Sequence, residues 1–316
     1  MLLVTGAAGF IGSNVLHALN GHGEDNILAV DDLTDGRKCQ NLVGKGFADY
    51  MDSAELLAAK SLPKFNGIIH LGAISDTQFS NGRVLMENNF LFSKRMLALA
   101  EKHGCPIVYA SSASVYGDGT NGFTEHVECE KPKSPYAFSK WAFDQYVRKL
   151  ADHITVPVVG LRYFNVYGPG ETHKGAMTSF AYRCFRAVQS GKKIQVFAGS
   201  QNFLRDFIYI DDAVDVTLFF LHANAAGIFN VGTGETTSFM QLAETIAAVT
   251  HSEPVEIIEF PESMRTGYQA YTRADLTKLR SAGWTHEFMS TEEGVERYWQ
   301  IFTESENTEC TTTTPS

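Results

Sequence analysis

A glycine-rich turn at the very start of the chain restricts its fold more than any other feature. The apolar run Leu2–Val4 predicts a strand, and Gly6, Gly9 and Gly12 follow it as a helical pattern opens. Gly6 permits a tight turn, Gly9 lets backbone approach a pyrophosphate, and Gly12 lets the helix pack closely on the strand. The helix N-terminus then offers free N–H groups to the phosphates. The chain is therefore predicted to begin with a dinucleotide-binding unit.

An acidic pair, Asp31 and Asp32, ends the second predicted strand about 20 residues further on, where the adenosine ribose of a dinucleotide is bound. Asp31 can accept hydrogen bonds from a 2′-hydroxyl, and the charge of Asp32 repels a 2′-phosphate. Arg37 and Lys38 follow within one loop and can pair with that phosphate, or they can be solvated loop cations. The residues alone leave NAD and NADP both open.

Short β-branched runs alternate with helical stretches over the first two-thirds of the chain. This alternation is typical of a parallel sheet that helices cover on both faces. The predicted fold class is therefore α/β, a Rossmann-type doubly wound parallel sheet with a smaller α/β substrate domain. The strands predicted for the sheet are Leu2–Val4, Ile27–Val30, Gly67–Leu71, Ile107–Ala110 and Val156–Leu161.

The alternation of strand and helix patterns ends after Gly168-Pro169, where an irregular loop is expected over residues 170–175. The segment Asp206–Ile210 is expected to return to the sheet. The predicted divisions are a dinucleotide-binding domain of residues 1–167 with a returning segment at about 206–235, a substrate-binding domain of residues 168–205 and 236–303, and a disordered tail of residues 304–316.

Three residues near the centre of the chain predict acid–base chemistry. Ser112 ends the fourth predicted strand, and Tyr136 and Lys140 lie four residues apart on one face of the following helix. A lysine ammonium near the phenol is expected to lower the pKa of Tyr136 towards working pH, as a general base requires. Ser112 can hydrogen-bond a substrate oxygen. The combination with the glycine turn predicts a dinucleotide-dependent enzyme.

Composition narrows the possible partners. The formal charge of -10, without a basic run, argues against nucleic acid or an anionic membrane as the main partner. The five cysteines are scattered without metal-ligand spacing, so no metal site is expected. No apolar stretch approaches the roughly 20 residues of a membrane span. We therefore expect a soluble cytoplasmic protein.

Several blocks of sequence resemble known enzymes. With the glycine turn and the Tyr136–Lys140 motif, the chain resembles the extended short-chain dehydrogenase/reductases. Within them it is similar to the ADP-L-glycero-D-manno-heptose 6-epimerase family over residues 1 to about 302. The more specific blocks are Ala48–Asp52, Arg162–Pro169, His173–Gly175, Arg205–Phe207, Tyr268–Thr272 and Ala274–Arg280.

The resemblance implies an activity. Such enzymes oxidise a sugar carbon with tightly bound NAD(P), let the ketone rotate and return the hydride to its other face. Inversion needs proton transfer on both faces, so the resemblance implies Tyr136 for one face and Lys174 for the other. Lys174 could instead be an exposed loop cation or a pyrophosphate contact, and His173 is expected to be a loop residue. The implied reaction inverts C6 of ADP-D-glycero-D-manno-heptose for lipopolysaccharide core, in a homo-oligomer, a pentamer by resemblance.

Further residues match the family's binding positions. The implied cofactor is NADP, with NAD possible, and its implied contacts are Gly6, Gly9, Phe10, Ile11, Gly12, Asp31, Asp32, Lys38, Leu71, Gly72, Ala73, Ile74, Ser75, Asn88, Tyr136, Lys140, Val166 and Lys174. The positions implied for the nucleotide-sugar substrate are Asn165, Ala176, Arg183, Phe197, Ala198, Gly199, Ser200, Arg205 and Tyr268. Arg205 is suited to a bidentate grip on a diphosphate, or to a structural salt bridge with Asp206 or Asp212.

Some positions depart from the family pattern. Asp32 stands where asparagine is usual and Ser53 where a lysine can hold a 2′-phosphate, which weakens the implication of NADP. Leu71, Ala176 and Arg183 replace an acidic residue, a serine and a histidine, which leaves the sugar and nucleotide open.

The same residues allow two other enzymatic functions and one non-enzymatic function. A UDP-hexose 4-epimerase fits the shared motifs equally well, and only the C-terminal blocks and Lys174 argue against it. A 4,6-dehydratase needs an acidic pair where Ala113 and Ser114 stand. A non-catalytic NAD(P)-binding protein is disfavoured by the intact motif residues.

Overall fold

A seven-stranded parallel sheet forms the centre of the computed structural model, which describes residues 1–261 and 269–311. Its strand order is β11-β6-β5-β4-β1-β2-β3. The sheet strands are β1 (Leu2–Thr5), β2 (Ile27–Asp31), β3 (Asp49–Asp52), β4 (Gly67–His70), β5 (Ile107–Ser112), β6 (Val158–Tyr163) and β11 (Gly227–Val231). The Rossmann-type fold class predicted from the sequence is confirmed.

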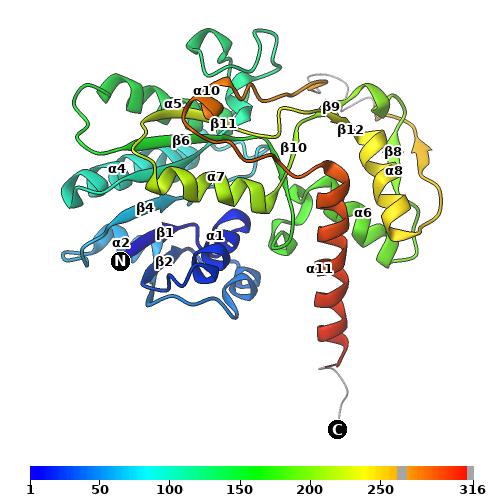
Figure 1. Ribbon diagram of the computed structural model, residues 1–316, viewed down its shortest axis with the longest axis horizontal. Helices are drawn as coiled ribbons and strands as arrows, with labels where there is room; N and C mark the ends of the chain where they lie inside the picture. The colour runs from blue at the N-terminus through cyan, green and yellow to red at the C-terminus, as the bar shows by residue number, and fades with distance from the viewer. Residues whose placement is uncertain (262–268, 312–316) are drawn as a thin grey trace.

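Alternate residues of the strands pack on opposite faces, which explains why the strands are apolar throughout. Val4 and Ile69 belong to a core cluster with α1 (Phe10–Gly21) and α7 (Ile210–His222). Leu3 and Ile68 face the other way, into a cluster with α4 (Phe92–His103) and α5 (Pro135–Leu150). Figure 1 shows α7 running across one face of this sheet. The sheet is therefore buried on both sides.

All five predicted sheet strands are present within one or two residues of their expected bounds, and the sheet also contains β3. The sequence Asp49-Tyr50-Met51-Asp52 gave no apolar signal because β3 is an exposed or half-buried edge strand that pairs only with β2 among the described residues. Edge strands carry polar residues more readily than central strands.

A second, smaller region of helices and short strands lies beside the sheet, around α6 and α8 (Figure 1). Its strands form two-stranded pairs, β8 with β13 and β9 with β12. The bounds are α6 (Phe180–Gln189), β8 (Gln195–Phe197), β9 (Leu204–Arg205), β12 (Thr237–Ser238), α8 (Phe239–Thr250), β13 (Glu256–Ile258) and α11 (Thr291–Thr311).

Two expectations for the later part of the chain were wrong. The segment Asp206–Ile210 does not rejoin the main sheet, because β10 (Phe207–Tyr209) pairs with β7 (Asn165–Tyr167) in a separate two-stranded sheet. The strand that does join the main sheet is β11, beside β6. The expected irregular loop contains a 3-10 helix, η5 (Thr172–Met177).

The remaining helices are short. They are η1 (Gly36–Leu42), α2 (Ser53–Ala58), α3 (Gly82–Leu85), the π-helix η2 (Met86–Leu91), η3 (Ala113–Tyr116), η4 (Val127–Cys129), η6 (Ser200–Asn202) and α10 (Thr277–Ser281). The terminal helix α11 continues to Thr311, so residues 304–311 differ from the expected disordered tail.

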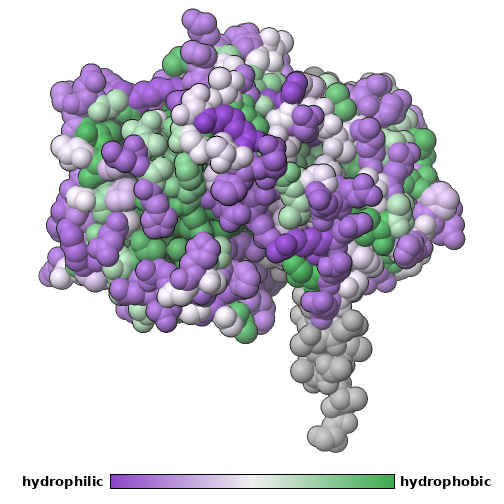
Figure 2. Space-filling view, in the orientation of Figure 1, coloured by the Kyte–Doolittle hydropathy of each residue, from purple (hydrophilic) through white to green (hydrophobic). Residues whose placement is uncertain are grey.

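Hydrophilic residues predominate on the face drawn in Figure 2, with smaller hydrophobic areas between them. Within residues 1–261 and 269–311, no helix combines the length and apolar character that crossing a membrane requires.

Candidate active site

A cavity of about 550 Å³ lies at the carboxyl edge of the central sheet, where open α/β sheets bind ligands. We call it the cleft. Its lining unites segments that lie far apart in the sequence: Gly6, Gly9, Phe10, Ile11, Gly12, Asp31, Lys38, Leu71, Gly72, Ala73, Ser75, Thr77, Ala110, Ser111, Ser112, Tyr136, Lys140, Tyr163, Phe164, Asn165, Val166, His173, Lys174 and Met177. Most predicted cofactor residues and all four predicted catalytic residues are therefore brought together.

The glycine turn fits a dinucleotide. Gly6 has φ +71°, and a Cβ at Gly12 would lie 2.0 Å from the carbonyl oxygen of Gly6. A side chain at Gly12 would push α1 away from the turn. The Asp31 carboxylate accepts a hydrogen bond from the Ala8 N–H at 2.7 Å, so the turn and the end of β2 are locked together. The backbone approach and carboxylate position that a pyrophosphate and ribose require are both present.

The cations near Asp31 are already paired. Lys38 donates to the Asp31 carboxylate and to the backbone oxygen of Asp32. Arg37 forms a bidentate pair with Asp35, with hydrogen bonds of 2.9 and 2.7 Å. The exposed Asp32 side chain lies outside the cleft lining, and hydrogen bonds from Thr34 lower the pKa of its carboxyl. Both basic residues of this loop therefore have carboxylate partners.

A buried polar chain holds the loop after β4. His70 lies between the Thr5 hydroxyl, 2.6 Å from Nδ1, and the Ser93 hydroxyl, 2.9 Å from Nε2. Thr5 also accepts the Gly72 N–H at 3.2 Å, and Ser93 donates to the Asn89 carbonyl oxygen. This pattern assigns a neutral imidazole with its proton on Nε2. Burial, with a contribution from the charge of Lys140, lowers the pKa of His70 to about 3.

Asn89, the residue after the predicted cofactor contact Asn88, holds the loop that follows β4. Its side chain accepts the Ile74 N–H at 2.9 Å and donates to the Ile74 carbonyl oxygen at 3.1 Å. It also donates to the Ser139 hydroxyl at 3.0 Å. Asn88 is exposed, bonds the Val84 carbonyl oxygen and does not line the cleft. Neither does Ile74, which is held by its backbone.

Tyr136 and Lys140 lie on the first turns of α5, which Ser134 caps by accepting the Ala137 N–H. Burial raises the pKa of Tyr136, and a hydrogen bond with Ser112 acts in the opposite direction. The Lys140 ammonium donates to the Ala110 carbonyl oxygen at 2.9 Å, and burial lowers its pKa to about 8. The expected lowering of the Tyr136 pKa is therefore wrong for this arrangement, because Lys140 bonds to the backbone of β5.

A buried ion cluster fixes α5 against the sheet one turn after Lys140. Asp144 accepts hydrogen bonds from Tyr109 at 3.0 Å, Ser111 at 2.9 Å and Arg162 at 2.8 Å. All of these side chains are buried. A buried carboxylate with several donors resists displacement, since each lost bond leaves a charge unpaired. The cluster therefore sets the position of α5 and of the two residues that it presents to the cleft.

Lys174 enters the cleft from η5. Its ammonium lies 4.9 Å from the centre of the Phe10 ring, so the loop that follows β7 approaches the glycine turn. Asn41 joins the same two segments, donating to the Ala8 carbonyl oxygen at 2.9 Å and to the Gly170 carbonyl oxygen at 3.2 Å. Its amide also lies 3.3 Å from Nδ1 of His173. Asn41 thus ties the loop that carries Lys174 to the glycine turn.

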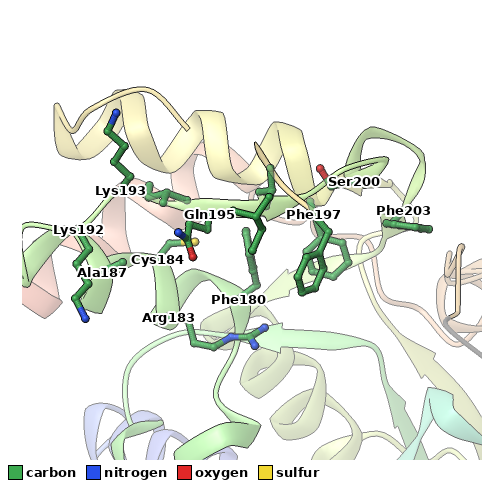
Figure 3. A pocket seen from close by; sticks show the side chains of 14 residues that line it. Phe180, Arg183, Cys184, Ala187, Lys192, Lys193, Gln195, Phe197, Ser200 and Phe203 are labelled. Atoms are coloured by element: carbon green, nitrogen blue, oxygen red, sulfur yellow. The ribbon is translucent and has the colours of Figure 1, made fainter. Parts of the chain in front are cut away.

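A second cavity of about 660 Å³, drawn in Figure 3, lies in the smaller region. It is lined by Phe180, Arg183, Cys184, Ala187, Lys192, Lys193, Ile194, Gln195, Val196, Phe197, Ser200, Phe203, Phe239 and Ile258. Figure 3 shows the amines of Lys192 and Lys193 extending away from the Phe197 ring. The predicted substrate positions Arg183, Phe197 and Ser200 are therefore together, but outside the cleft.

The other predicted substrate positions are divided. Asn165 lines the cleft, whereas the exposed Ala176 and Ala198 and the half-buried Gly199 line neither cavity. Arg205 is buried and donates to the backbone oxygens of Leu204 and Gln269. Tyr268 lies outside the described residues. The cleft also contains Tyr163 and Phe164, which belong to the family block Arg162–Pro169 but were not selected, and Thr77 and Met177, for which the sequence gave no signal.

The fold and the cleft define a class of protein, a Rossmann-type enzyme with a Ser–Tyr–Lys site at the carboxyl edge of its sheet. The model of the NAD dependent epimerase/dehydratase family matches residues 2–232, and the chain belongs to this family. Its cofactor is accordingly an NAD(P) dinucleotide.

Individual relatives are similar over nearly the whole chain. The chain is 45% identical over 313 residues to an ADP-L-glycero-D-manno-heptose-6-epimerase of Brachyspira hyodysenteriae, covering 96% of this chain and 98% of that protein. A crystal structure of the Helicobacter pylori protein of that name superposes with a TM-score of 0.85 at 27% identity, covering 96% of each chain. A Thermus thermophilus UDP-glucose 4-epimerase in complex with NAD has a TM-score of 0.76 at 28% identity, covering 96% of this chain and 98% of that one.

Proposed function

We propose that the protein inverts C6 of the heptose in ADP-D-glycero-D-manno-heptose to give ADP-L-glycero-D-manno-heptose. One observation carries the proposal: Tyr136 and Lys174, two proton-transferring side chains from separate elements, line the same cleft as the glycine turn. The Brachyspira relative, with 45% identity over almost the full length, supports the heptose substrate. A product of this kind serves lipopolysaccharide core synthesis.

In the proposed mechanism each face of the sugar carbon has its own proton-transfer group. A dinucleotide held at the glycine turn would supply hydride acceptance and hydride return at that carbon. Tyr136 takes the hydroxyl proton on one face, with Ser112 bonded to the reacting oxygen. Lys174 gives a proton to the oxygen after the ketone has turned. Lys140 lines the same cleft, where its ammonium is held on the Ala110 carbonyl oxygen.

We propose that the second cavity binds the nucleotide half of the substrate. Phe197 and Phe180 offer ring faces for a base, and stacking on an aromatic ring is worth about 1–3 kcal/mol per base. Arg183 lies at the same cavity, and its guanidinium is suited to a phosphate oxygen. A substrate that spans the two cavities would place its sugar at Tyr136 and its nucleotide at Phe197.

We propose NAD as the preferred cofactor, in place of the NADP that the resemblance implied. A 2′-phosphate would have to compete with Asp31 for Lys38 and with Asp35 for Arg37. Asp32 and Ser53 supply no compensating cation. The family description and the NAD-bound Thermus relative agree with this preference. Mass spectrometry of the dinucleotide released on denaturation tests it, and release of NADP alone would contradict it.

A UDP-hexose 4-epimerase is the second candidate, favoured by the similarity to the Thermus UDP-glucose 4-epimerase. Incubation of the purified protein with ADP-D-glycero-D-manno-heptose, followed by NMR of the C6 configuration, tests the first proposal. UDP-glucose serves as the competing substrate in a parallel sample. We expect an equilibrium mixture of heptose epimers and no UDP-galactose. The opposite result would assign the 4-epimerase.

We also propose that the protein forms a homo-oligomer in the cytoplasm. Light scattering of the purified holoenzyme measures the number of subunits, for which the resemblance implies five.

A further inference from the structure

Glu171 is a fully buried carboxylate with no role in the mechanism given above. It immediately precedes η5 and is 0% exposed. Its carboxylate accepts the Ser179 N–H at 2.6 Å, and the Lys174 ammonium lies 3.4 Å away. The Gly168 N–H approaches its other oxygen at 3.5 Å. The carboxylate thus contacts the backbone on both sides of the loop and the lysine in its middle.

The charge of Glu171 needs a partner. An ionised carboxylate removed from water is costly unless it is paired and hydrogen-bonded. Two of its contacts are neutral N–H groups, and Lys174 supplies a positive charge. The Lys174 side chain is 22% exposed, so this ion pair is shielded from water more than a surface pair. The pair therefore restrains Lys174 on the side of the loop that faces the cleft.

The backbone around the pair closes the loop at both ends. The Lys174 N–H donates to the Glu171 carbonyl oxygen at 2.9 Å. Gly175 then breaks the helix with φ 56° and ψ -122°. Ser179, whose N–H is bonded by Glu171, is the N-cap of α6. One carboxylate therefore spans the kink and joins Lys174 to the helix that lines the second cavity.

We propose that Glu171 is a positioning residue that holds the Lys174 ammonium at the reacting oxygen and couples it to α6. The inference rests on the proposed function, in which Lys174 is the second acid/base. Glu171 acts through Lys174 and does not itself touch the substrate. Phe180 and Arg183 lie on the first turns of α6, so a nucleotide in the second cavity and the proton donor in the cleft share one support.

A double-mutant cycle tests this inference on the intact holoenzyme with ADP-D-glycero-D-manno-heptose. The variants are Glu171→Gln, Lys174→Met and the pair combined. Glutamine keeps an oxygen for the Ser179 N–H and removes the charge. The matched control is Glu125→Gln, since Glu125 is half-buried, bonds the Asn230 N–H at 2.8 Å and lines neither cavity.

We expect Glu171→Gln to lower kcat by roughly 10- to 100-fold, because small misplacements of a reacting group cost about that much, while KM changes less than about twofold. The double variant should be no slower than Lys174→Met, since the two residues act as one unit. Multiplicative losses, or a loss confined to KM, would overturn the inference. Near-normal turnover in Lys174→Met would instead remove Lys174 from the mechanism, and the inference with it.

A second readout does not depend on turnover. Acetylation of Lys174 by acetic anhydride, followed by mass spectrometry of its peptide, reports how freely the amine reacts. We expect faster acetylation in Glu171→Gln than in the wild type and an unchanged rate in Glu125→Gln. Equal rates in all three proteins would show that Glu171 does not restrain Lys174, even if Lys174 is catalytic.

Discussion

The cleft and the second cavity are similar in size but are built in different ways. The cleft is lined by the ends of sheet strands, by glycine backbone and by buried titratable groups such as Tyr136 and Lys140. The second cavity is lined largely by apolar and aromatic side chains such as Phe197, which come from helix α6, from short strands and from the segments between them. The proposed reactive groups Tyr136 and Lys140 thus lie at the central sheet, and the proposed nucleotide-binding surface lies in the smaller region. Variants should therefore separate turnover from affinity.

The largest expected effect is on turnover in the cleft. Tyr136→Phe removes the phenolic proton acceptor and should lower kcat by roughly 10²–10⁴-fold, with ADP affinity unchanged. Epimerisation followed by NMR and calorimetric titration of ADP measure the two quantities. Tyr146→Phe, on the same helix but outside both cavities, is the control. If Tyr136→Phe weakened ADP binding as strongly as turnover, the two regions would not be separate in function.

The converse experiment addresses the second cavity. Phe197→Ala should weaken ADP binding by roughly 5- to 150-fold, the equivalent of about 1–3 kcal/mol of lost stacking, and change kcat much less. Phe138→Ala is the control, because Phe138 is exposed on α5 and lines neither cavity. Unchanged ADP affinity in Phe197→Ala would place the nucleotide elsewhere.

Acid should destabilise the region around the cleft at a higher pH than the region around the second cavity. The folded-state pKa of His70 is about 3, below its ordinary value of 6.5. Its neutral form therefore contributes stability that is present above pH 6.5 and is lost as pH falls towards 3. The loss is about 1.4 kcal/mol per pH unit, or about 2 kcal/mol between pH 6.5 and pH 5.

Denaturant unfolding at pH 7 and pH 5 measures this loss. His70→Gln should show a smaller difference between the two pH values than the wild type, and the exposed His153→Gln should behave as the wild type does. Hydrogen exchange should then increase first in β4 and the loop after it. Equal acid sensitivity in wild type and His70→Gln would contradict a buried neutral imidazole.

The smallest expected effect is on cofactor choice at the edge of the cleft. Lys38→Ala leaves Asp31 without its cation, so a 2′-phosphate meets an unscreened carboxylate. NADP affinity should fall by about 5- to 10-fold, corresponding to roughly 1 kcal/mol, with NAD affinity nearly unchanged. Calorimetric titration of both dinucleotides measures the two affinities. Equal losses of NAD and NADP affinity would mean that Lys38 does not interact with the 2′-phosphate.

Features set by local spacing could be predicted from the sequence. The glycine turn, Asp31 and the Tyr136–Lys140 pair depend on short stretches of chain, and the structure brings them to one cleft. The edge strand β3 was missed because its residues are polar. Asn88 was taken from the resemblance to the family, whereas the structure buries the neighbouring Asn89 in the π-helix η2. Neither outcome follows from periodicity.

Long-range contacts account for the other differences. Lys140 bonds the Ala110 carbonyl oxygen, 30 residues away, instead of setting the Tyr136 pKa directly. The second cavity depends on the pairing of β8 with β13, segments that are distant in the sequence. The role of Glu171 could not be predicted, because a single glutamate in an expected loop is ordinarily a solvated charge, and only the structure shows that it is buried.

The three bonds of Asn41 have a consequence for how the cofactor is used. Its side-chain amide contacts Ala8 in the glycine turn and Gly170 and His173 in the loop that carries Lys174, so it holds the loop against the turn. An enzyme that oxidises and then reduces the same carbon leaves its dinucleotide in the starting oxidation state after every cycle. It has no need to trade a spent coenzyme for a fresh one. A loop fixed in this way is expected to slow release of the dinucleotide, whereas a dehydrogenase must release its coenzyme after each turnover.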